Sequence, residues 1–172
     1  MCGEFTAYVF VFIHLGTRKV YCSSSTYHPD ADWIMQQARN ASMWFEEIGI
    51  EPRYLIRDRD RKFPDSFDVF WKDAGVRTIK IPPRAPRANA FCESFIGTIK
   101  KSCLNYFICF SLGQLDYINK TWLDHYHFQR PHQGKDIGNN VLDTNFKPQT
   151  EGTIKHREKL GGIVSEYFRE AA

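Results

Sequence analysis

The sequence predicts an α/β fold in which helices cover the faces of a mixed β-sheet. Two observations predict it: the chain opens on a hairpin-like pair of strand runs, and strand-like runs then alternate with helical patterns as far as residue 81. The length of 172 residues suits one domain with a real core. Aromatic residues make up 15% of the chain, so that core should be built on large rings.

The first elements are a hairpin and a helix. Residues 7–15 and 18–24 are dense in β-branched and aromatic residues, and the turn Gly16-Thr17 separates them. Asp30 then offers a helix start, and Gly49 offers the stop. Between them, apolar residues recur at spacings of four and three and predict one buried helical face: Ile34, Ala38, Ala41, Phe45 and Ile48.

Two short strands and a second helix follow. Residues 53–57 hold Tyr-Leu-Ile between charges and predict a buried strand, and residues 76–81 predict another. The helix between them ends at Gly75 and is marked by four residues, Phe67, Phe70, Trp71 and Ala74. Three prolines within residues 82–86 then exclude regular structure.

Two helices follow the proline loop. The first begins near Ala88 or Asn89, and its inner side should hold Phe95, Ile99 and Cys103. The second covers residues 114–128 with four inward residues, Leu115, Ile118, Trp122 and Tyr126. The chain is polar and irregular from Pro131 through Thr153, and the more apolar residues 160–168 have no clear assignment. We therefore expect a core domain over residues 1–135 and a C-terminal extension over residues 136–172.

Several function classes are disfavoured by composition. No run of about 18 apolar residues occurs, so we expect no membrane span, and the first residues do not resemble a signal peptide. The five cysteines form no C-x-x-C pair, so we expect free thiols in a reducing cytoplasm. His125, His127 and His132 lack the cysteine or carboxylate partners of a zinc site, and Pro131 favours a helix end there instead.

The net charge of +3 conceals a local basic stretch. Between Arg77 and Lys101 the only acid is Glu93, and it faces six bases: Arg77, Lys80, Arg84, Arg87, Lys100 and Lys101. Such a stretch in a nearly neutral protein indicates a polyanion on one face. Charge alone leaves the alternative open that this is an ordinary solvated surface.

Three acids stand where a metal site could form. Asp58 and Asp60 directly follow the strand 53–57, at the strand end where ligands of α/β sheets usually bind, and the path to Glu93 can return to the same edge. Mg²⁺ prefers such oxygen ligands. Lys100 lies seven residues after Glu93, so both side chains share a helix face. The alternative is a solvated turn and an ordinary helix surface.

Three sequence blocks carry a specific resemblance to a known protein family. Leu-Ile-Arg-Asp-Arg-Asp-Arg-Lys-Phe at 55–63, the proline-arginine loop leading into Glu93 at 81–93, and His-Tyr-His-Phe-Gln-Arg-Pro-His at 125–132 occur in this order. They resemble the integrase core shared by retroviral integrases and many bacterial insertion-sequence transposases. The resemblance covers about residues 7–135, and Leu160–Tyr167 is also similar to bacterial members.

The resemblance implies an RNase H-like fold and Mg²⁺- or Mn²⁺-dependent cutting of DNA, followed by attack of the 3′ hydroxyl on target DNA. It implies that Asp58 is the second catalytic and metal-binding Asp and Glu93 the catalytic and metal-binding Glu. Asp60 fits the second position less well, because the Lys-Phe pair that follows sets the register on Asp58. The DNA-binding candidates are Lys100, Lys101, Arg84, Arg87 and Asn89. Multimers on paired DNA ends in the bacterial cytoplasm are a further implication.

One departure from the family pattern concerns its first Asp, which lies on the first strand of the sheet. Residues 8–20 match the second and third strands, so the first Asp should lie upstream of Met1. His14 belongs to the second strand, and nothing places Glu4 in the site. We therefore expect the first strand to be missing, metal binding to be poor and strand transfer to be absent. A misplaced start, a decayed element and a non-catalytic binder all remain open.

Three functions compete at this point. The first is an enzyme core for DNA integration or transposition, inactive as this chain stands. The second is a remnant of a transposase that has no catalytic activity and binds nucleic acid through the basic stretch. The third is an RNase H-like nuclease on RNA–DNA hybrids, against which the block 82–93 argues.

Overall fold

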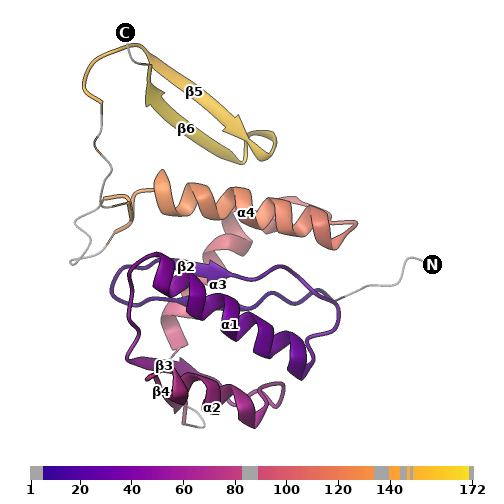
Figure 1. The fold of residues 1–172 in the computed structure, drawn as a ribbon. Helices are drawn as coiled ribbons and strands as arrows, with labels where there is room; N and C mark the ends of the chain where they lie inside the picture. The colour runs from indigo at the N-terminus through magenta and orange to yellow at the C-terminus, as the bar shows by residue number, and fades with distance from the viewer. Residues whose placement is uncertain (1–5, 83–88, 134–139, 144–146, 148, 171–172) are drawn as a thin grey trace. The chain divides into compact units, whose positions relative to one another are not determined.

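The structure, a computed structural model, describes residues 6–82, 89–133, 140–143, 147 and 149–170 (Figure 1). It has a mixed α/β architecture and divides into two compact units. The first unit comprises Met1–His14 and Tyr21–Phe95, and the second comprises Leu15–Val20 and Ile96–Ala172. The boundary expected at residue 135 stays a prediction.

The predicted N-terminal hairpin is present. Strand β1 (Val11–Ile13) pairs with β2 (Val20–Cys22), and an antiparallel bridge between Tyr8 and Thr26 extends the pairing. The regular strands are shorter than the runs predicted for them. Ser23 explains one end, because its hydroxyl accepts the Phe10 N–H at 2.8 Å in place of a ladder carbonyl.

Helix α1 (Ala31–Glu47) confirms the predicted apolar face. Asp30 caps it, since its carboxylate accepts the Trp33 N–H at 2.8 Å. Gly49 follows the helix with φ of +68°, a conformation that glycine adopts without steric cost. The buried residues are Ile34, Gln37, Ala38, Ala41 and Phe45. Only Gln37 among them was not anticipated, and its side chain accepts a hydrogen bond from the Tyr21 hydroxyl at 3.3 Å.

Strands β3 (Tyr54–Arg57) and β4 (Arg77–Lys80) are parallel, and α2 (Asp65–Asp73) connects them. The prediction that the first of these strands is buried is wrong for one of its faces. Successive side chains alternate between faces, and Tyr54 and Ile56 are 61% and 39% exposed. On the other face Leu55 packs against the core and Arg57 is buried.

An aromatic core holds the first unit together, as the composition predicts. Phe12, Phe67 and Trp71 are 6%, 1% and 1% exposed, and the rings of Phe12 and Trp71 lie 5.8 Å apart between centroids. Phe10 and Phe63 extend the cluster, with centroids 5.6 Å apart. This core therefore joins the hairpin to α2 through side chains.

One continuous mixed sheet was expected, and the described strands do not form one. They make three two-stranded sheets, β1–β2, β3–β4 and β5–β6. Phe12 of β1 and Leu55 of β3 belong to the same core, yet no ladder joins the two strands. Sheets merge only where backbone N–H and C=O groups of adjacent strands meet, and no described strand does this between β1 and β3.

Three helical segments follow: α3 (Ala90–Ser102), the 3₁₀ turn η2 (Leu104–Tyr106) and α4 (Leu112–Phe128). The predicted inner side of α3 is confirmed, since Phe95, Ile99 and Cys103 are buried. Helix α4 begins two residues earlier than predicted, because the Ser111 hydroxyl caps it by accepting the Gln114 N–H at 3.2 Å. It buries Ile118, Asn119, Trp122 and Tyr126.

The C-terminal residues form a hairpin that the sequence did not predict. Strands β5 (Ile154–Lys159) and β6 (Val164–Arg169) pair in antiparallel register around a tight turn (Figure 1). The turn needs left-handed backbone at three consecutive residues, Leu160, Gly161 and Gly162, with φ of 52°, 65° and 90°. Glu166 is buried and pairs with Lys159 Nζ at 2.7 Å. Its carboxylate lies 3.9 Å from His125 Nδ1 of α4.

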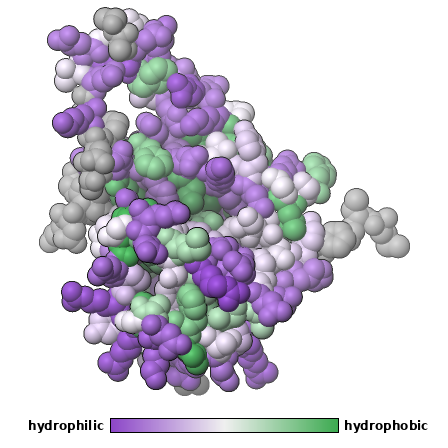
Figure 2. Space-filling model, viewed as in Figure 1, coloured by the Kyte–Doolittle hydropathy of each residue, from purple (hydrophilic) through white to green (hydrophobic). Residues whose placement is uncertain are grey.

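Two features concern the hydropathy of the helices and of the surface. Among the described residues no helix is both long and apolar enough to cross a membrane. The face seen in Figure 2 is mostly hydrophilic, with smaller hydrophobic patches between the hydrophilic residues.

Candidate metal and nucleic-acid site

Asp58 is the first residue after β3, at the carboxyl end of a strand in a parallel pair. Its side chain is exposed, and one carboxylate oxygen accepts the Asp60 N–H at 3.1 Å. This local hydrogen bond fixes the turn that follows the strand. The carboxylate therefore sits where a parallel sheet usually presents its ligands.

Arg57 anchors the strand end on which Asp58 stands. Its guanidinium makes a two-pronged contact with Asp68 of α2, at 2.9 Å from Nε and 2.8 Å from Nη2. A third hydrogen bond runs from Nη1 to the Asp58 carbonyl oxygen at 3.0 Å, and the guanidinium stacks 4.6 Å from the centre of the Phe63 ring. The Arg57 contact holds the pKa of Asp68 below its usual value, with Lys80 adding to the effect.

Asp60, the alternative second carboxylate, is engaged elsewhere. Its carboxylate accepts the Lys62 N–H at 2.9 Å and lies 3.2 Å from Lys62 Nζ. The backbone hydrogen bond from Lys62 is the main reason that the pKa of Asp60 is lowered. A carboxylate bound in this way is a poorer candidate ligand than that of Asp58, which accepts the Asp60 backbone N–H.

Glu93 lies in the first turn of α3 and is exposed. Its neighbour Cys92 reports on the surroundings: burial raises the pKa of this thiol, and the negative charges of Asp58 and Glu93 raise it further. Cys22 of β2 lies near Cys92 as well. Burial raises the pKa of Cys22 to about 12, and the charge of Cys92 contributes to this shift. Asp58 at the end of β3 and Glu93 at the start of α3 are therefore both near enough to Cys92 for their charges to raise its pKa.

The structure describes three of the five candidate residues for binding nucleic acid. Lys100 and Lys101 are exposed in the last turn of α3, and Asn89 is half-buried directly before that helix. Arg84 and Arg87 lie outside the described residues. Lysines at the end of a helix also interact favourably with its dipole, so their position alone has a structural explanation.

Asp58 and Glu93 fit a hard divalent cation in kind but not in number. Carboxylate oxygens are the ligands that Mg²⁺ and Mn²⁺ take, and both side chains are exposed. Among the described residues no group of three or more histidine, cysteine, aspartate or glutamate side chains is placed to hold a metal. Cys22 and Cys92 add soft thiol ligands that Mg²⁺ does not favour.

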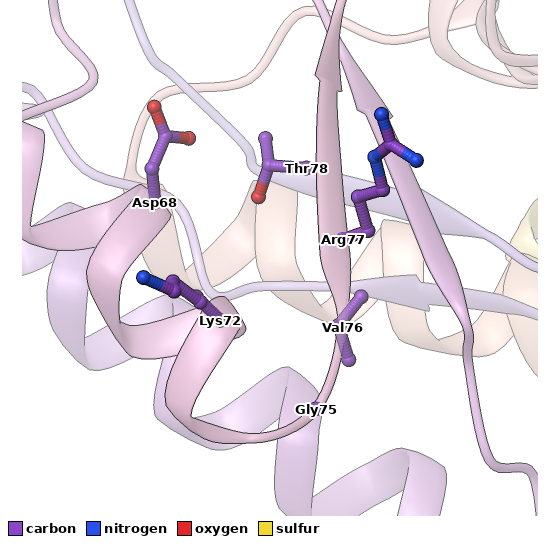
Figure 3. A pocket seen from close by; sticks show the side chains of 6 residues that line it. All are labelled: Asp68, Lys72, Gly75, Val76, Arg77 and Thr78. Carbon is purple, nitrogen blue, oxygen red and sulfur yellow. The ribbon is translucent and has the colours of Figure 1, made fainter.

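A pocket of about 430 Å³ lies between α2 and β4 (Figure 3). It is lined by Asp68, Lys72, Gly75, Val76, Arg77 and Thr78. The Arg77 side chain points away from α2 (Figure 3). Since neither Asp58 nor Glu93 lines it, the pocket does not bear on their chemistry.

Two parts of this site were not predicted from the sequence. The Arg57–Asp68 pair joins residues eleven apart in different elements, and an arginine in a short strand usually signals exposure. Cys92 carried no signal beyond its place next to Glu93. A charge immediately before the candidate Asp, with an acid on the next helix, is the pattern that could have revealed the anchor.

The reactivity of Cys92 gives a test of the geometry. Neutralising either nearby carboxylate, by Asp58→Asn or Glu93→Gln, should lower the pKa of Cys92 and raise its alkylation rate at mildly alkaline pH by a few-fold. Asp60→Asn is the matched control and should leave that rate unchanged. Peptide mass spectrometry after iodoacetamide treatment separates Cys92 from the exposed Cys109. Equal rates in the wild type and Asp58→Asn would show that Asp58 lies too far from Cys92.

Comparison with known proteins adds family information. Residues 74–136 match the family model described as integrase core domain. The insertion element IS476 uncharacterized 39.2 kDa protein of Xanthomonas euvesicatoria is 35% identical over 82 residues, which are 47% of this chain and 24% of that protein. The chain therefore matches about a quarter of this relative's length.

A solved structure supports the fold over nearly the whole chain. A chain in the cryo-EM structure of the simian T-cell lymphotropic virus intasome, in complex with PP2A regulatory subunit B56 gamma, aligns with a TM-score of 0.59. The alignment covers 95% of this chain and 65% of that chain at 11% sequence identity, so the likeness is one of fold. Residues 74–136 are thus similar in sequence to the integrase core domain, part of the chain is similar to an insertion-element protein, and the fold resembles that of an intasome chain.

Proposed function

We propose that the chain is the core of a DNA integrase or transposase, in which Asp58 and Glu93 contribute to one divalent metal site. The observation that carries the proposal is the placement of two exposed carboxylates, Asp58 at the carboxyl end of β3 and Glu93 in the first turn of α3, where the charges of both raise the pKa of Cys92. The similarity of residues 74–136 to the integrase core domain supports the proposed reaction class, phosphodiester cleavage and strand transfer on DNA. Lys100 and Lys101, exposed at the far end of the same helix, supply positive charge for the phosphate backbone.

Mg²⁺ or Mn²⁺, when bound, would activate an attacking oxygen and stabilise the leaving oxygen of a phosphodiester. The chain's own residues supply the oxygen ligands and their placement. Arg57 holds the Asp58 carbonyl and the strand end, so that the Asp58 carboxylate stays at the sheet edge. Glu93 is held by a helix that is anchored two residues later by the buried side chain of Phe95.

The proposed metal site needs one more carboxylate than these two residues provide. We infer that a strand pairing with both β1 and β3 would join their two sheets into one and would carry it, as the RNase H-like arrangement implies. Residues of both strands pack in the same aromatic core, although no ladder joins the two strands. A core in which no such strand pairs with β1 and β3 should bind the metal weakly and should not carry out strand transfer.

Two measurements test this proposal. Electron paramagnetic resonance titration with Mn²⁺ should show weak binding to the wild type, further weakened in Asp58→Asn and Glu93→Gln but not in the control Asp60→Asn. Incubation of a labelled element end with Mg²⁺ should give no cleavage by the purified chain. Clear turnover would overturn the expected lack of a ligand, and equal Mn²⁺ binding by all four proteins would overturn the site itself.

A non-catalytic nucleic-acid-binding role is the second candidate, favoured by the exposed Lys100 and Lys101. It predicts binding to duplex DNA that weakens as salt rises and is unchanged by Glu93→Gln or by a chelator. Removing either lysine should weaken binding across all sequences and reduce the salt dependence by about one counterion. Chelator-sensitive binding would instead favour a metal-assisted role.

The cellular setting follows from the same proposal. The bacterial insertion-element relative supports a bacterial cytoplasmic protein that associates with the nucleoid through DNA. Its partners would be element ends and target DNA, together with further copies of the chain on paired ends. Sedimentation of the chain with and without duplex DNA tests the last point.

A further inference from the structure

An exposed aromatic segment follows the basic end of α3. Tyr106 and Phe110 are 65% and 86% exposed, and Ile108 between them is 77% exposed. These are large values for side chains that normally seek the interior. From Ser102 through Leu115 the chain carries no charged residue, while Lys100 and Lys101 precede it directly.

The segment is held in place at both ends. The Tyr106 N–H donates to the Cys103 carbonyl at 3.0 Å, and Cys103 itself is fully buried. The Phe110 N–H donates to Gln114 Oε1 at 2.8 Å, next to the Ser111 cap of α4. Phe107 is in extended conformation, with φ of −123° and ψ of 143°. Both rings are therefore presented to solvent from an ordered backbone.

We propose that Tyr106 and Phe110 form a stacking platform for unpaired bases of DNA, with Lys100 and Lys101 holding the adjoining phosphates. This inference rests on the proposed function, since it assigns these rings to the unpaired strand of the DNA that the core would handle. Aromatic rings beside cations are the usual means of binding single strands, because each base offers a π face and each phosphate a negative charge. Charge complementarity favours a nucleic acid here over an uncharged protein surface, which would leave the lysines unused.

Substitutions that separate the ring from its apolar bulk test the platform. The probe is a fluorescein-labelled 20-nucleotide oligothymidine, with a blunt duplex of equal length as the second arm. Phe110→Leu and Tyr106→Leu keep an apolar side chain but remove the π face, and each should weaken single-strand binding by roughly 5- to 100-fold. Phe110→Trp should retain it, and Ile108→Ala is the matched control that should leave it unchanged.

The two arms distinguish this inference from the proposed function. Duplex binding should survive both leucine substitutions, and Lys100→Ala with Lys101→Ala should weaken both arms. If Phe110→Leu binds the single strand as tightly as the wild type, the platform is refuted while duplex binding still supports the DNA role. If sedimentation shows self-association that Ile108→Ala disrupts and Phe110→Leu preserves, the segment is a protein-docking surface. Absence of binding in both arms overturns both proposals.

Discussion

Asp68→Ala is expected to lower the free energy of unfolding by about 3 kcal/mol, because it leaves a buried guanidinium without its counter-ion. Arg57 is only 8% exposed and makes two short hydrogen bonds to the Asp68 carboxylate. Asp68 itself is 25% exposed, which places the effect at the lower end for broken buried pairs. The contact of Asp68 with Lys80 adds little, since Lys80 is 49% exposed.

Urea unfolding of the purified chain measures this effect. The matched control is Asp73→Ala on the same helix, where the carboxylate is exposed near the C-terminal end and the change should stay within about 0.5 kcal/mol. The double variant Arg57→Met with Asp68→Leu should recover most of the loss, since an apolar pair needs no counter-ion. A loss for Asp68→Ala no larger than that of the control would contradict the buried pair.

The parts of the fold that the sequence predicted are those set by local rules. In α1 the apolar spacing and the Asp30 cap decide the helix without help from distant residues, and both are observed. In α3 the spacing of Phe95, Ile99 and Cys103 does the same. The hairpin β1–β2 followed from its β-branched runs and its turn.

The parts that were missed depend on partners far along the chain. β5 is exposed over most of its length and reads as a polar loop, and only its pairing with β6 makes it a strand. Arg57 is buried because Asp68 and the rings of Phe63 and Phe67 surround it. The sequence places Asp58 at the end of a strand and Glu93 beside Cys92 in a helix, but only the structure brings Asp58 near enough for its charge to raise the pKa of Cys92.

His127 should make the second unit lose stability as pH falls. Its ring Nε2 accepts the Val20 N–H at 3.0 Å, so it must be unprotonated to keep this bond. Burial lowers the pKa of His127 from 6.5 to about 4, with smaller contributions from Lys19 and His132. The unfolded chain therefore binds a proton that the folded chain does not between pH 6.5 and about 4.

The sign follows from this difference in proton binding. The stabilisation is complete above pH 6.5 and is lost as pH falls towards 4, by up to about 3 kcal/mol in the free energy of unfolding. His125 and His132 act in the same direction, because burial lowers the pKa of both. His127→Gln isolates the effect: its amide oxygen can still accept the Val20 N–H but does not titrate. Urea midpoints between pH 7 and 4 should fall less steeply for this variant, and parallel profiles would mean that the proton goes elsewhere.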